Sequence, residues 1–294
     1  MNQPAEPVAV EEPAVRSAFP NGHFYSPVVD PAELLPRAEH IWNGSLACPG
    51  IEFDPVRHRD VLENLLPHYL PRYDYPETLE ETPTLDRFFT RNSQFNWLDP
   101  RILFAFLNEW RPRRMIEVGS GYSSLLVADV NRRFLGNTLD FTCIEPYPRE
   151  FLKNRIDGIT RVIEAKVQDV DPAEFERLQA GDILFVDSSH VSKTGSDVNH
   201  LVFEIFPRLR AGVRIHIHDI FLPADYPKDW VFGENRSWNE QYVVRALLMY
   251  STAFRVLFGC CYAFLAFPEL INRAFRLKEG RTFGGGSLWL EKME

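Results

Sequence analysis

One stretch decides the fold of this chain: Met115-Ile-Glu-Val-Gly-Ser-Gly-Tyr-Ser-Ser124. Its apolar beginning is typical of a buried strand, and Gly119 and Gly121 permit a tight turn that a ligand can approach closely. A helical pattern of apolar residues opens near Ser123, directly after the turn. A strand, a glycine turn and a helix in this order predict the first unit of an α/β fold, with a ligand-binding edge at the turn.

The same alternation continues along the rest of the chain. The expected strands are Met115–Val118, Phe141–Glu145, Thr160–Ala165, Ile183–Asp187, Val213–His218, Phe254–Gly259 and Ser287–Leu290. The expected helices are Asp99–Trp110, Ser123–Phe134, Pro148–Arg155, Pro172–Gln179, Asp197–Leu209 and Asn239–Ser251. This alternation predicts a mostly parallel sheet with helices on both faces, and it places ligands outside the carboxyl ends of the strands.

The chain before Trp97 has a different amino-acid composition. Residues 1–19 are rich in Ala, Pro, Glu and Val, and we expect a disordered tail there. Residues 20–96 are rich in proline and aromatic side chains, which predicts an irregular, partly helical N-terminal cap with short helices at Pro31–Asn43 and Val56–Tyr69. Residues 97–294 are assigned to the main domain.

Composition narrows the class of protein. The 294 residues are 45% hydrophobic and 25% charged, which excludes collagen-like and fully disordered chains. The net charge of −9 disfavours general binding to nucleic acid. The four cysteines show no metal-binding spacing and are expected to be buried free thiols. The start of the chain does not read as a signal peptide, and the longest apolar run, Val256–Phe267, is too short to span a bilayer. We therefore expect a soluble, cytoplasmic protein without a membrane partner.

Two carboxylates indicate the kind of ligand. Glu117 stands in the first strand beside the glycine turn, where it would repel a pyrophosphate but suit an amine or another cation. Glu145 ends the second strand, where an acid can accept hydrogen bonds from both hydroxyls of a ribose. Ser124 replaces the third glycine of a dinucleotide fingerprint, and the turn lacks the lysine of a P-loop. An adenosine with a cationic amino-acid tail, S-adenosyl-L-methionine, fits both carboxylates.

In these features the chain resembles the class I S-adenosylmethionine-dependent methyltransferases, in their methyltransferase-24-like, small-molecule group. The resemblance covers residues 97–294 and is carried by Glu117–Ser123, Glu145-Pro146, Val167–Asp169, Ile183–Asp187 and Ser287–Leu290. It implies a Rossmann-like, doubly wound sheet of seven strands in the order 3-2-1-4-5-7-6, with the last strand antiparallel. The residues predicted to contact the cofactor are Glu117, Gly119, Ser120, Gly121, Tyr122, Ser123, Glu145, Gln168, Asp169 and Asp187. Asp169 or Gln168 would lie near the adenine, although Asp169 equally suits the start of a helix.

Histidines and carboxylates follow the fourth and fifth strands, as Asp187-Ser-Ser-His190 and His216-Ile-His218-Asp219. These strand ends are neighbours in the order above, so their side chains should meet at one rim. His190, His218 and Asp219 are the candidate catalytic residues, as general bases for a hydroxyl acceptor, whereas His216 is expected in the core. Two alternatives stay open: a divalent metal held by Asp187, His218 and Asp219, or purely structural histidines.

The sequence thus predicts transfer of a methyl group to a small-molecule acceptor, with a hydroxyl oxygen favoured. An S-adenosylmethionine-binding module without turnover is the alternative, and a nicotinamide-dependent oxidoreductase is disfavoured by Glu117 and the absent third glycine. The aromatic loop Asp219–Trp230 would form a wall for the acceptor or pack against the cap. Tyr262–Gly286 would form a lid or a solvated charged face. The sequence does not predict the oligomeric state.

Overall fold

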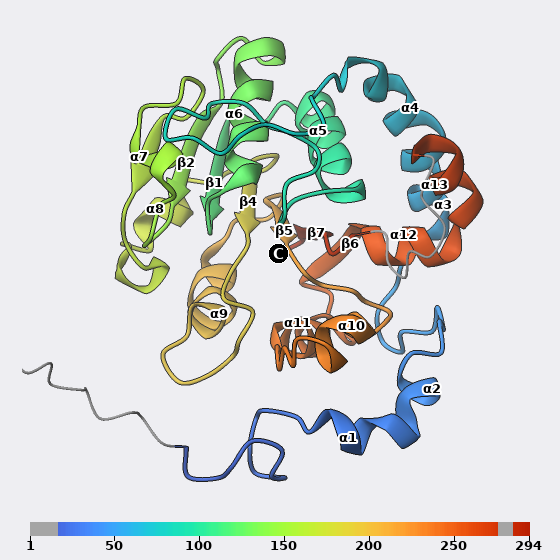
Figure 1. Cartoon of the computed structure of the whole chain (residues 1–294). Coiled ribbons are helices and arrows are strands. Elements are labelled where there is room, and N and C mark those ends of the chain that lie inside the picture. Colours follow the sequence, from blue (N-terminus) through green and yellow to red (C-terminus); the bar gives the residue numbers. More distant parts are fainter. Residues whose placement is uncertain (1–16, 276–284) are drawn as a thin grey trace, which may run out of the picture.

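The computed structural model describes residues 17–275 and 285–294, which form a seven-stranded sheet covered by helices (Figure 1). The strands are β1 (Arg114–Val118), β2 (Asp140–Ile144), β3 (Arg161–Ile163), β4 (Ile183–Val186), β5 (Arg214–Ile217), β6 (Phe254–Gly259) and β7 (Leu288–Lys292). Their order is β3-β2-β1-β4-β5-β7-β6. Strands β1 to β5 pair in parallel, and β7 runs antiparallel to both β5 and β6. The predicted fold class is therefore confirmed.

The helices follow the predicted alternation, with several shorter than expected. They are α1 (Pro31–Leu34), α2 (Ala38–Ile41), α3 (Pro55–Asp60), α4 (Leu66–Tyr69), α5 (Leu98–Trp110), α6 (Tyr122–Phe134), α7 (Glu150–Lys153), α8 (Ala173–Glu176), α9 (Asp197–His200), α10 (Lys228–Phe232), α11 (Glu240–Leu248), α12 (Cys260–Ala266) and α13 (Pro268–Phe275). Short 3-10 turns are η1 (Leu35–Arg37), η3 (Leu70–Arg72), η4 (Val167–Asp169) and η6 (Phe206–Arg208), and π-helical segments are η2 (Val61–Leu65) and η5 (Leu201–Ile205).

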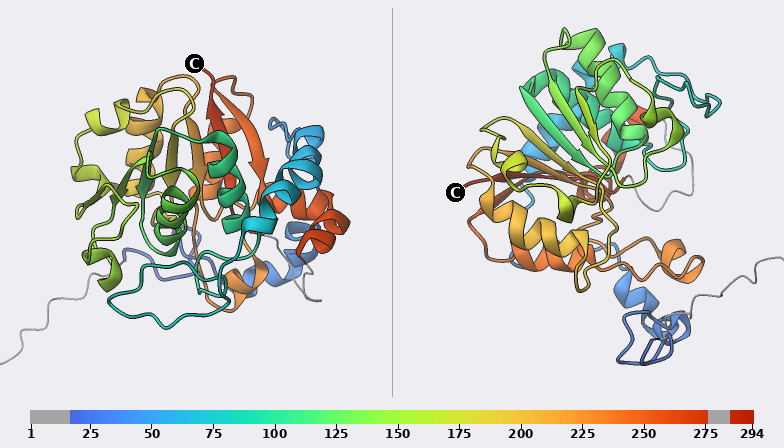
Figure 2. Two further views of the ribbon diagram at one scale, coloured as in Figure 1. Left: turned by 90° about the horizontal axis from the view of Figure 1, so that it is seen from above. Right: turned by 90° about the vertical axis from the view of Figure 1, so that its left-hand side faces the viewer.

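The sheet separates two apolar cores, one under each layer of helices (Figure 2). Phe141 and Phe185 point toward α5 and α6, whereas Val118 and Val186 point toward η5 and α11. Successive residues of a strand face opposite sides, so Phe185 and Val186 serve different cores. Both faces are buried, which explains why these strands read as nearly continuous apolar runs rather than alternating ones. The two cores hold the carboxyl edge of the sheet rigidly in place.

The N-terminal region lies against the main domain at separate places rather than as one compact cap (Figure 1). Near α2, the Trp42 indole donates to the Tyr226 carbonyl over 2.8 Å. Helix α3 lies beside β6, where the neutral His58 ring accepts the Gly259 N–H over 2.9 Å. Residues 73–97 then run along the carboxyl edge of the sheet to α5. Boundaries at residues 19/20 and 96/97 remain a prediction, and residues 1–16 of the expected tail lie outside the described residues.

The region Tyr262–Gly286, expected to form a lid or a solvated charged face, is divided in the structure: Gly285 and Gly286 line the cleft, whereas the helices before them do not cover it. Residues 260–275 form α12 and α13, which pack on α3 and η2 beside β6 and not over the ligand edge. The ring of Tyr262 stacks on Phe53 at 4.8 Å, and Phe267 packs against both apolar cores. Residues 276–284, which include three of the four basic side chains expected in that lid, lie outside the described residues. All four cysteines are buried and free, as predicted.

Candidate functional site

A single cleft of about 950 Å³ opens at the carboxyl edge of β1, β2, β4 and β5. One end is lined by the glycine turn after β1 and by Glu145, and the other by His218, Asp219 and three tryptophans. The residues 93–97 of the N-terminal region form part of the wall between these ends. The cleft therefore lies where the βα topology predicts a ligand, beside β1 and β4, where the strand order of the sheet reverses its direction.

The glycine turn fits closely against the end of β4. Gly119 has φ +80°, and a Cβ atom there would lie 1.8 Å from the carbonyl oxygen of Asp187. No other residue type fits this position without moving the backbone of the neighbouring strand. Gly121 instead leaves open space, since a Cβ atom there would meet only the Gln94 side chain at 3.8 Å. Gly119, Ser120, Gly121, Tyr122 and Ser123 all line the cleft, as their predicted role requires.

Glu117 lies behind this turn, fully buried. Its carboxylate accepts the hydroxyl of Ser123 over 2.6 Å and the hydroxyl of Ser124. Burial raises the pKa of Glu117 to about 7, even though hydrogen bonds from Ser123, Ser124 and Cys143 oppose that shift. This position does not favour the expected contact between Glu117 and an amine of the ligand. Both carboxylate oxygens already accept hydroxyl groups from the first turn of α6. In the structure Glu117 fixes the turn to the strand.

Glu145 lies on the cleft surface, as predicted for a residue that binds a ribose. One carboxylate oxygen accepts the N–H of Ser120 over 3.1 Å, and the other accepts the N–H of Tyr147 over 2.8 Å. Each carboxylate oxygen can accept more than one hydrogen bond, so capacity remains for ligand hydroxyls. The two backbone contacts hold the carboxylate against the glycine turn. Tyr147, which sequence reasoning did not single out, also lines the cleft and is 78% exposed.

Gln168 and Asp169, the candidate adenine contacts, lie in η4 away from the cleft. The Gln168 amide donates to the carbonyl of Gly195 over 2.9 Å, and Asp169 is exposed. Neither is among the described residues that line the cleft wall. Asp169 does not stand at a helix start either, since it is the last residue of η4, and Asp171 accepts the first N–H of α8 (Ala173–Glu176).

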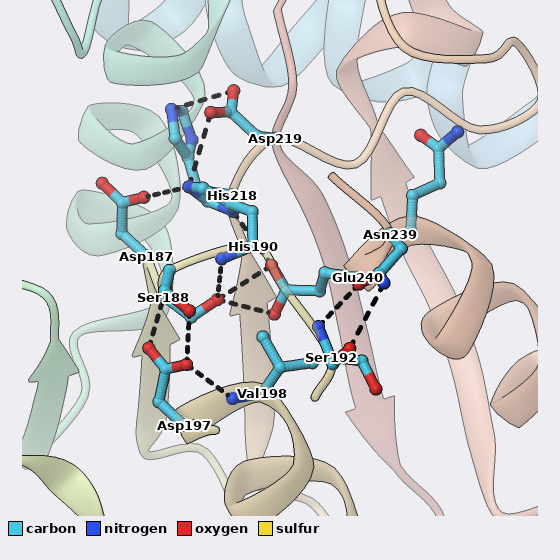
Figure 3. A network of polar contacts seen from close by, with 12 residues as sticks. Asp187, Ser188, His190, Ser192, Asp197, Val198, His218, Asp219, Asn239 and Glu240 are labelled. Atoms are coloured by element: carbon cyan, nitrogen blue, oxygen red, sulfur yellow. Dashed lines mark hydrogen bonds and ion pairs between the residues drawn. The ribbon is translucent and has the colours of Figure 1, made fainter. Parts of the chain in front are cut away.

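The predicted rim side chains do come together (Figure 3). His190 Nε2 lies 3.3 Å from Asp187 and 3.6 Å from Asp219, and His218 Nε2 lies 3.6 Å from the other Asp219 oxygen. The second ring nitrogen of His190 lies 2.9 Å from Glu240, a residue that the sequence did not indicate. His216 instead stacks on Phe185 at 3.8 Å in the core, as expected.

Burial and neighbouring charges shift the pKa values of three rim side chains, His190, His218 and Asp219. Burial works against a charged His190, but contacts with Asp187, Glu240 and Asp219 outweigh it and hold its pKa well above the usual value. This shift favours the protonated form of His190, whose two nitrogens are both directed at carboxylates. Burial raises the pKa of Asp219, and His218 and His190 only partly offset this. The pKa of His218 is raised as well, since Asp219, Asp187 and Asp99 together outweigh its burial.

A family model described as a methyltransferase domain matches residues 116–220, from β1 to just beyond β5. Residues 116–220 are thus a methyltransferase domain, and the sheet has the strand order expected of the class I S-adenosylmethionine-dependent methyltransferases. The match contains the glycine turn, Glu145 and the whole histidine rim. It ends before the loop that carries Trp230 and Trp238. The tryptophans on the acceptor side of the cleft therefore lie outside the region that the family model describes.

Relatives of this methyltransferase are distant. An uncharacterized protein of Archaeoglobus fulgidus is 35% identical over 172 residues, which are 56% of this chain and 76% of that protein. Among solved structures, a Klebsiella pneumoniae protein provisionally named an O-methyltransferase is 15% identical and has a TM-score of 0.39, covering 83% of this chain and 92% of its own. The O-methyltransferase from Bacillus cereus, solved with S-adenosylhomocysteine, is 12% identical with a TM-score of 0.36, covering 83% and 93%. TM-scores this low say nothing of the substrate of this chain.

Several residues of the methyltransferase cleft were missed from the sequence. Asp99, at the start of α5, accepts the N–H groups of Gly286 and Ser287 over 3.1 and 2.9 Å and so fixes the chain entering β7. Other lining residues that the sequence did not indicate are Ser93, Gln94, Phe95, Asn96, Trp97, Asp229, Glu234 and Arg236. The sequence indicated only that aromatic residues of the loop after β5 were available. The structure divides them, since Trp230 lines the cleft whereas Tyr226 packs beside Trp42.

No group of three or more His, Cys, Asp or Glu side chains within residues 17–275 and 285–294 is arranged to hold a metal ion. The candidate ligands Asp187 and Asp219 instead face the cationic ring of His190. In the same ranges, no helix is long and apolar enough to cross a membrane.

Proposed function

We propose that this methyltransferase transfers the methyl group of S-adenosylmethionine to a hydroxyl oxygen of a small molecule. The observation that carries the proposal is one continuous cleft whose two ends differ in chemistry. The end at the glycine turn offers backbone groups and Glu145 to a nucleoside, and the other end offers a carboxylate rim beneath tryptophans. A volume of about 950 Å³ suits the cofactor together with a small acceptor.

The cofactor half is supported by the chemistry of its residues. When bound, S-adenosylmethionine supplies a methyl group activated by a sulfonium centre. Glu145 would accept the ribose hydroxyls, the turn from Gly119 to Ser123 would hold the methionine part, and the exposed ring of Tyr147 would contact the adenine. Glu117 would act only indirectly, by holding Ser123 and Ser124 in place.

The acceptor hydroxyl must lose its proton as its oxygen bonds to the methyl carbon, and we assign that proton to Asp219. Its carboxylate lines the cleft, and its pKa is raised by burial toward the range that suits a base. His218 lies beside it and stabilises its charge before the proton arrives. His190 fits the role of base poorly, because both of its nitrogens already face carboxylates.

Calorimetry and a methyl-transfer screen test the proposal. S-adenosylhomocysteine should bind and NADH should not; stabilisation by NADH alone would refute the methyltransferase function. A metabolite screen with labelled S-adenosylmethionine would then identify the acceptor. Asp219→Asn and His218→Ala should keep S-adenosylhomocysteine binding and lose turnover, and retained activity in both would place the base elsewhere. Cofactor binding without transfer to any acceptor would favour the binding-module alternative.

A metal-assisted route through Asp187, His218 and Asp219 makes a separate prediction. Turnover that a chelator abolishes and a divalent ion restores would support it, and turnover unchanged by a chelator would support Asp219 acting alone. The acidic net charge of −9 supports a small-molecule acceptor over nucleic acid. A cytoplasmic location remains a prediction.

A further inference from the structure

Two consecutive buried polar residues open helix α11. Glu240 is 2% exposed and Gln241 is 1% exposed. Burying a carboxylate is costly unless it is well paired, so such a pair at a helix start calls for an explanation. Glu240 accepts the Ser188 hydroxyl, at 2.9 Å from both carboxylate oxygens, and lies 2.9 Å from His190 Nδ1 (Figure 3). Glu240 therefore joins α11 to the segment that follows β4.

Gln241 holds the other side of the same region. We call residues 219–239, which connect β5 to α11, the acceptor loop. The Gln241 side chain accepts the N–H of Phe221 over 2.6 Å and donates to the carbonyl of Ala224 over 3.2 Å. Its own N–H donates to the hydroxyl of Tyr226 over 3.0 Å. The first half of the acceptor loop is thus tied to α11, next to Glu240.

His190 contacts both ends of the acceptor loop. At the beginning, its Nε2 lies 3.6 Å from the Asp219 carboxylate. At the end, its carbonyl oxygen accepts the N–H groups of Asn239 and Glu240, each over 3.1 Å. Its ring also lies 4.3 Å from the ring of Trp238, between centroids. A residue that acted only as a base would not need contacts with both ends of a loop of this length.

A stack of side chains continues from His190 into the acceptor wall. The Arg236 guanidinium lies 4.7 Å from the ring of Trp238 and 4.1 Å from the ring of Trp230. Arg236 is also paired with Glu234 at 2.6 Å. The four side chains of the stack, His190, Trp238, Arg236 and Trp230, all line the acceptor end of the cleft. The His190 and Trp238 rings are tilted by 33° to each other, and the Arg236 guanidinium lies over both tryptophan rings, so the position of the His190 ring affects the position of the wall.

We propose that His190 and Glu240 are a positioning pair that sets the geometry of the acceptor wall and of the Asp219 carboxylate. Glu240 holds the His190 ring, and the ring supports Trp238 and orients Asp219. Glu240 touches neither the glycine turn nor Glu145, and His190 reaches the cofactor side only through Asp187, at 3.3 Å, so we expect the pair to act chiefly on acceptor binding. This inference rests on the proposed function for the identity of the site as an acceptor site.

The kinetic test compares two buried acids. Glu240→Gln keeps the shape but removes the charge, and it should raise the acceptor KM roughly tenfold, the loss of about one charge-assisted hydrogen bond. The affinity for S-adenosylhomocysteine should not change. Asp182→Asn is the matched control, since Asp182 is 3% exposed and accepts the N–H groups of Arg113 and Arg114 at the far end of the sheet. The control should lose stability with an unchanged KM, and an equal rise in both variants would overturn the positioning role.

A second test needs no acceptor. A charged imidazole in contact with an indole quenches the fluorescence of that indole, and the His190 and Trp238 ring centroids lie 4.3 Å apart, so Trp238 should be dim in the wild-type protein. Glu240→Gln should raise the emission, and the rise should vanish in the double variant Glu240→Gln/Trp238→Phe. Ser188→Ala, which removes only one partner of Glu240, should give a smaller rise in the same direction. An emission that neither variant changes would refute the proposal, whereas failure of S-adenosylhomocysteine to bind would refute the methyltransferase function instead.

Discussion

The buried carboxyl of Glu117 predicts how the stability of the protein depends on pH. Its pKa is raised from 4.5 to about 7 by burial, while an unfolded chain would return it to the ordinary value. Each unit of pKa difference corresponds to about 1.4 kcal/mol, so the 2.5 units between the two states amount to roughly 3 kcal/mol. A single side chain thus contributes a pH dependence that is a sizeable fraction of typical domain stability.

The sign follows from where the proton is bound. Between pH 4.5 and about 7 the folded state keeps the Glu117 proton and the unfolded state releases it. The stabilising contribution is complete below pH 4.5 and is lost as the pH rises through about 7. Glu117→Gln mimics the protonated form at every pH, so this variant should not share the loss. Its stability relative to wild type should therefore rise by roughly 3 kcal/mol from acid to mildly alkaline pH.

Reversible urea unfolding across this pH range measures the difference directly. The comparison of variant with wild type cancels the other titrating groups, among them His58, whose pKa is lowered to about 4 by burial. Glu150→Gln provides the control, because Glu150 is exposed and pairs only with Lys153 at 2.6 Å. A difference between Glu117→Gln and wild type that stays constant with pH would show that Glu117 is ionised throughout, and would refute this account of its burial.

Three further substitutions test the described contacts. Glu145→Ala should weaken S-adenosylhomocysteine binding by about 2 kcal/mol in calorimetry, the scale of lost hydrogen bonds to a carboxylate, whereas Glu150→Ala should not. Gly119→Ala should abolish that binding, because its Cβ atom would lie 1.8 Å from the Asp187 carbonyl oxygen; measurable affinity would contradict the close approach. Asp99→Ala should lower the free energy of unfolding by about 2–4 kcal/mol, since two backbone N–H groups before β7 lose their charged acceptor, and an unchanged urea midpoint would argue against that tether.

The fold could be predicted because each strand and helix carries its own local pattern. The prediction of the region after β6 failed for a specific reason. The apolar run Val256–Phe267 contains both the end of β6 and the whole of α12, with Gly259 and Cys260 at the boundary. A short, continuous apolar run cannot be divided into a buried strand and a buried helix by periodicity alone. The expected lid began at Tyr262, inside that run, so helix α12 was not recognised within it.

The residues of the site could be predicted only where a single strand and the turn after it contain them. Glu145, Asp187 and the histidine rim follow directly from strand ends, and the structure brings them to one cleft. The ring centroids of Phe95 and His218 lie 5.4 Å apart. These two residues are distant in the chain, so no local sequence pattern predicts their contact. Glu117 was assigned from the sequence to an amine of the ligand, whereas in the structure its carboxylate accepts the hydroxyls of Ser123 and Ser124, which reach back to the strand from the first turn of α6.

The backbone at the rim shows why such a site resists prediction from local rules. Trp97, His190 and Asp219 have φ of +64°, +60° and +56°, values that residues other than glycine seldom adopt. Each costs roughly 1–3 kcal/mol and persists only where surrounding contacts fix it. All three line one cleft, although they come from three separate segments. Asp219 is packed so closely that a Cβ atom on Gly286 would lie 2.8 Å from its Cα. Arg111, Asn137, Asn235 and Tyr250 also have positive φ and do not line the cleft, so this conformation is not confined to the site. At Trp97, His190 and Asp219, however, it directs side chains from three segments to one ligand-binding edge, which no local sequence pattern specifies.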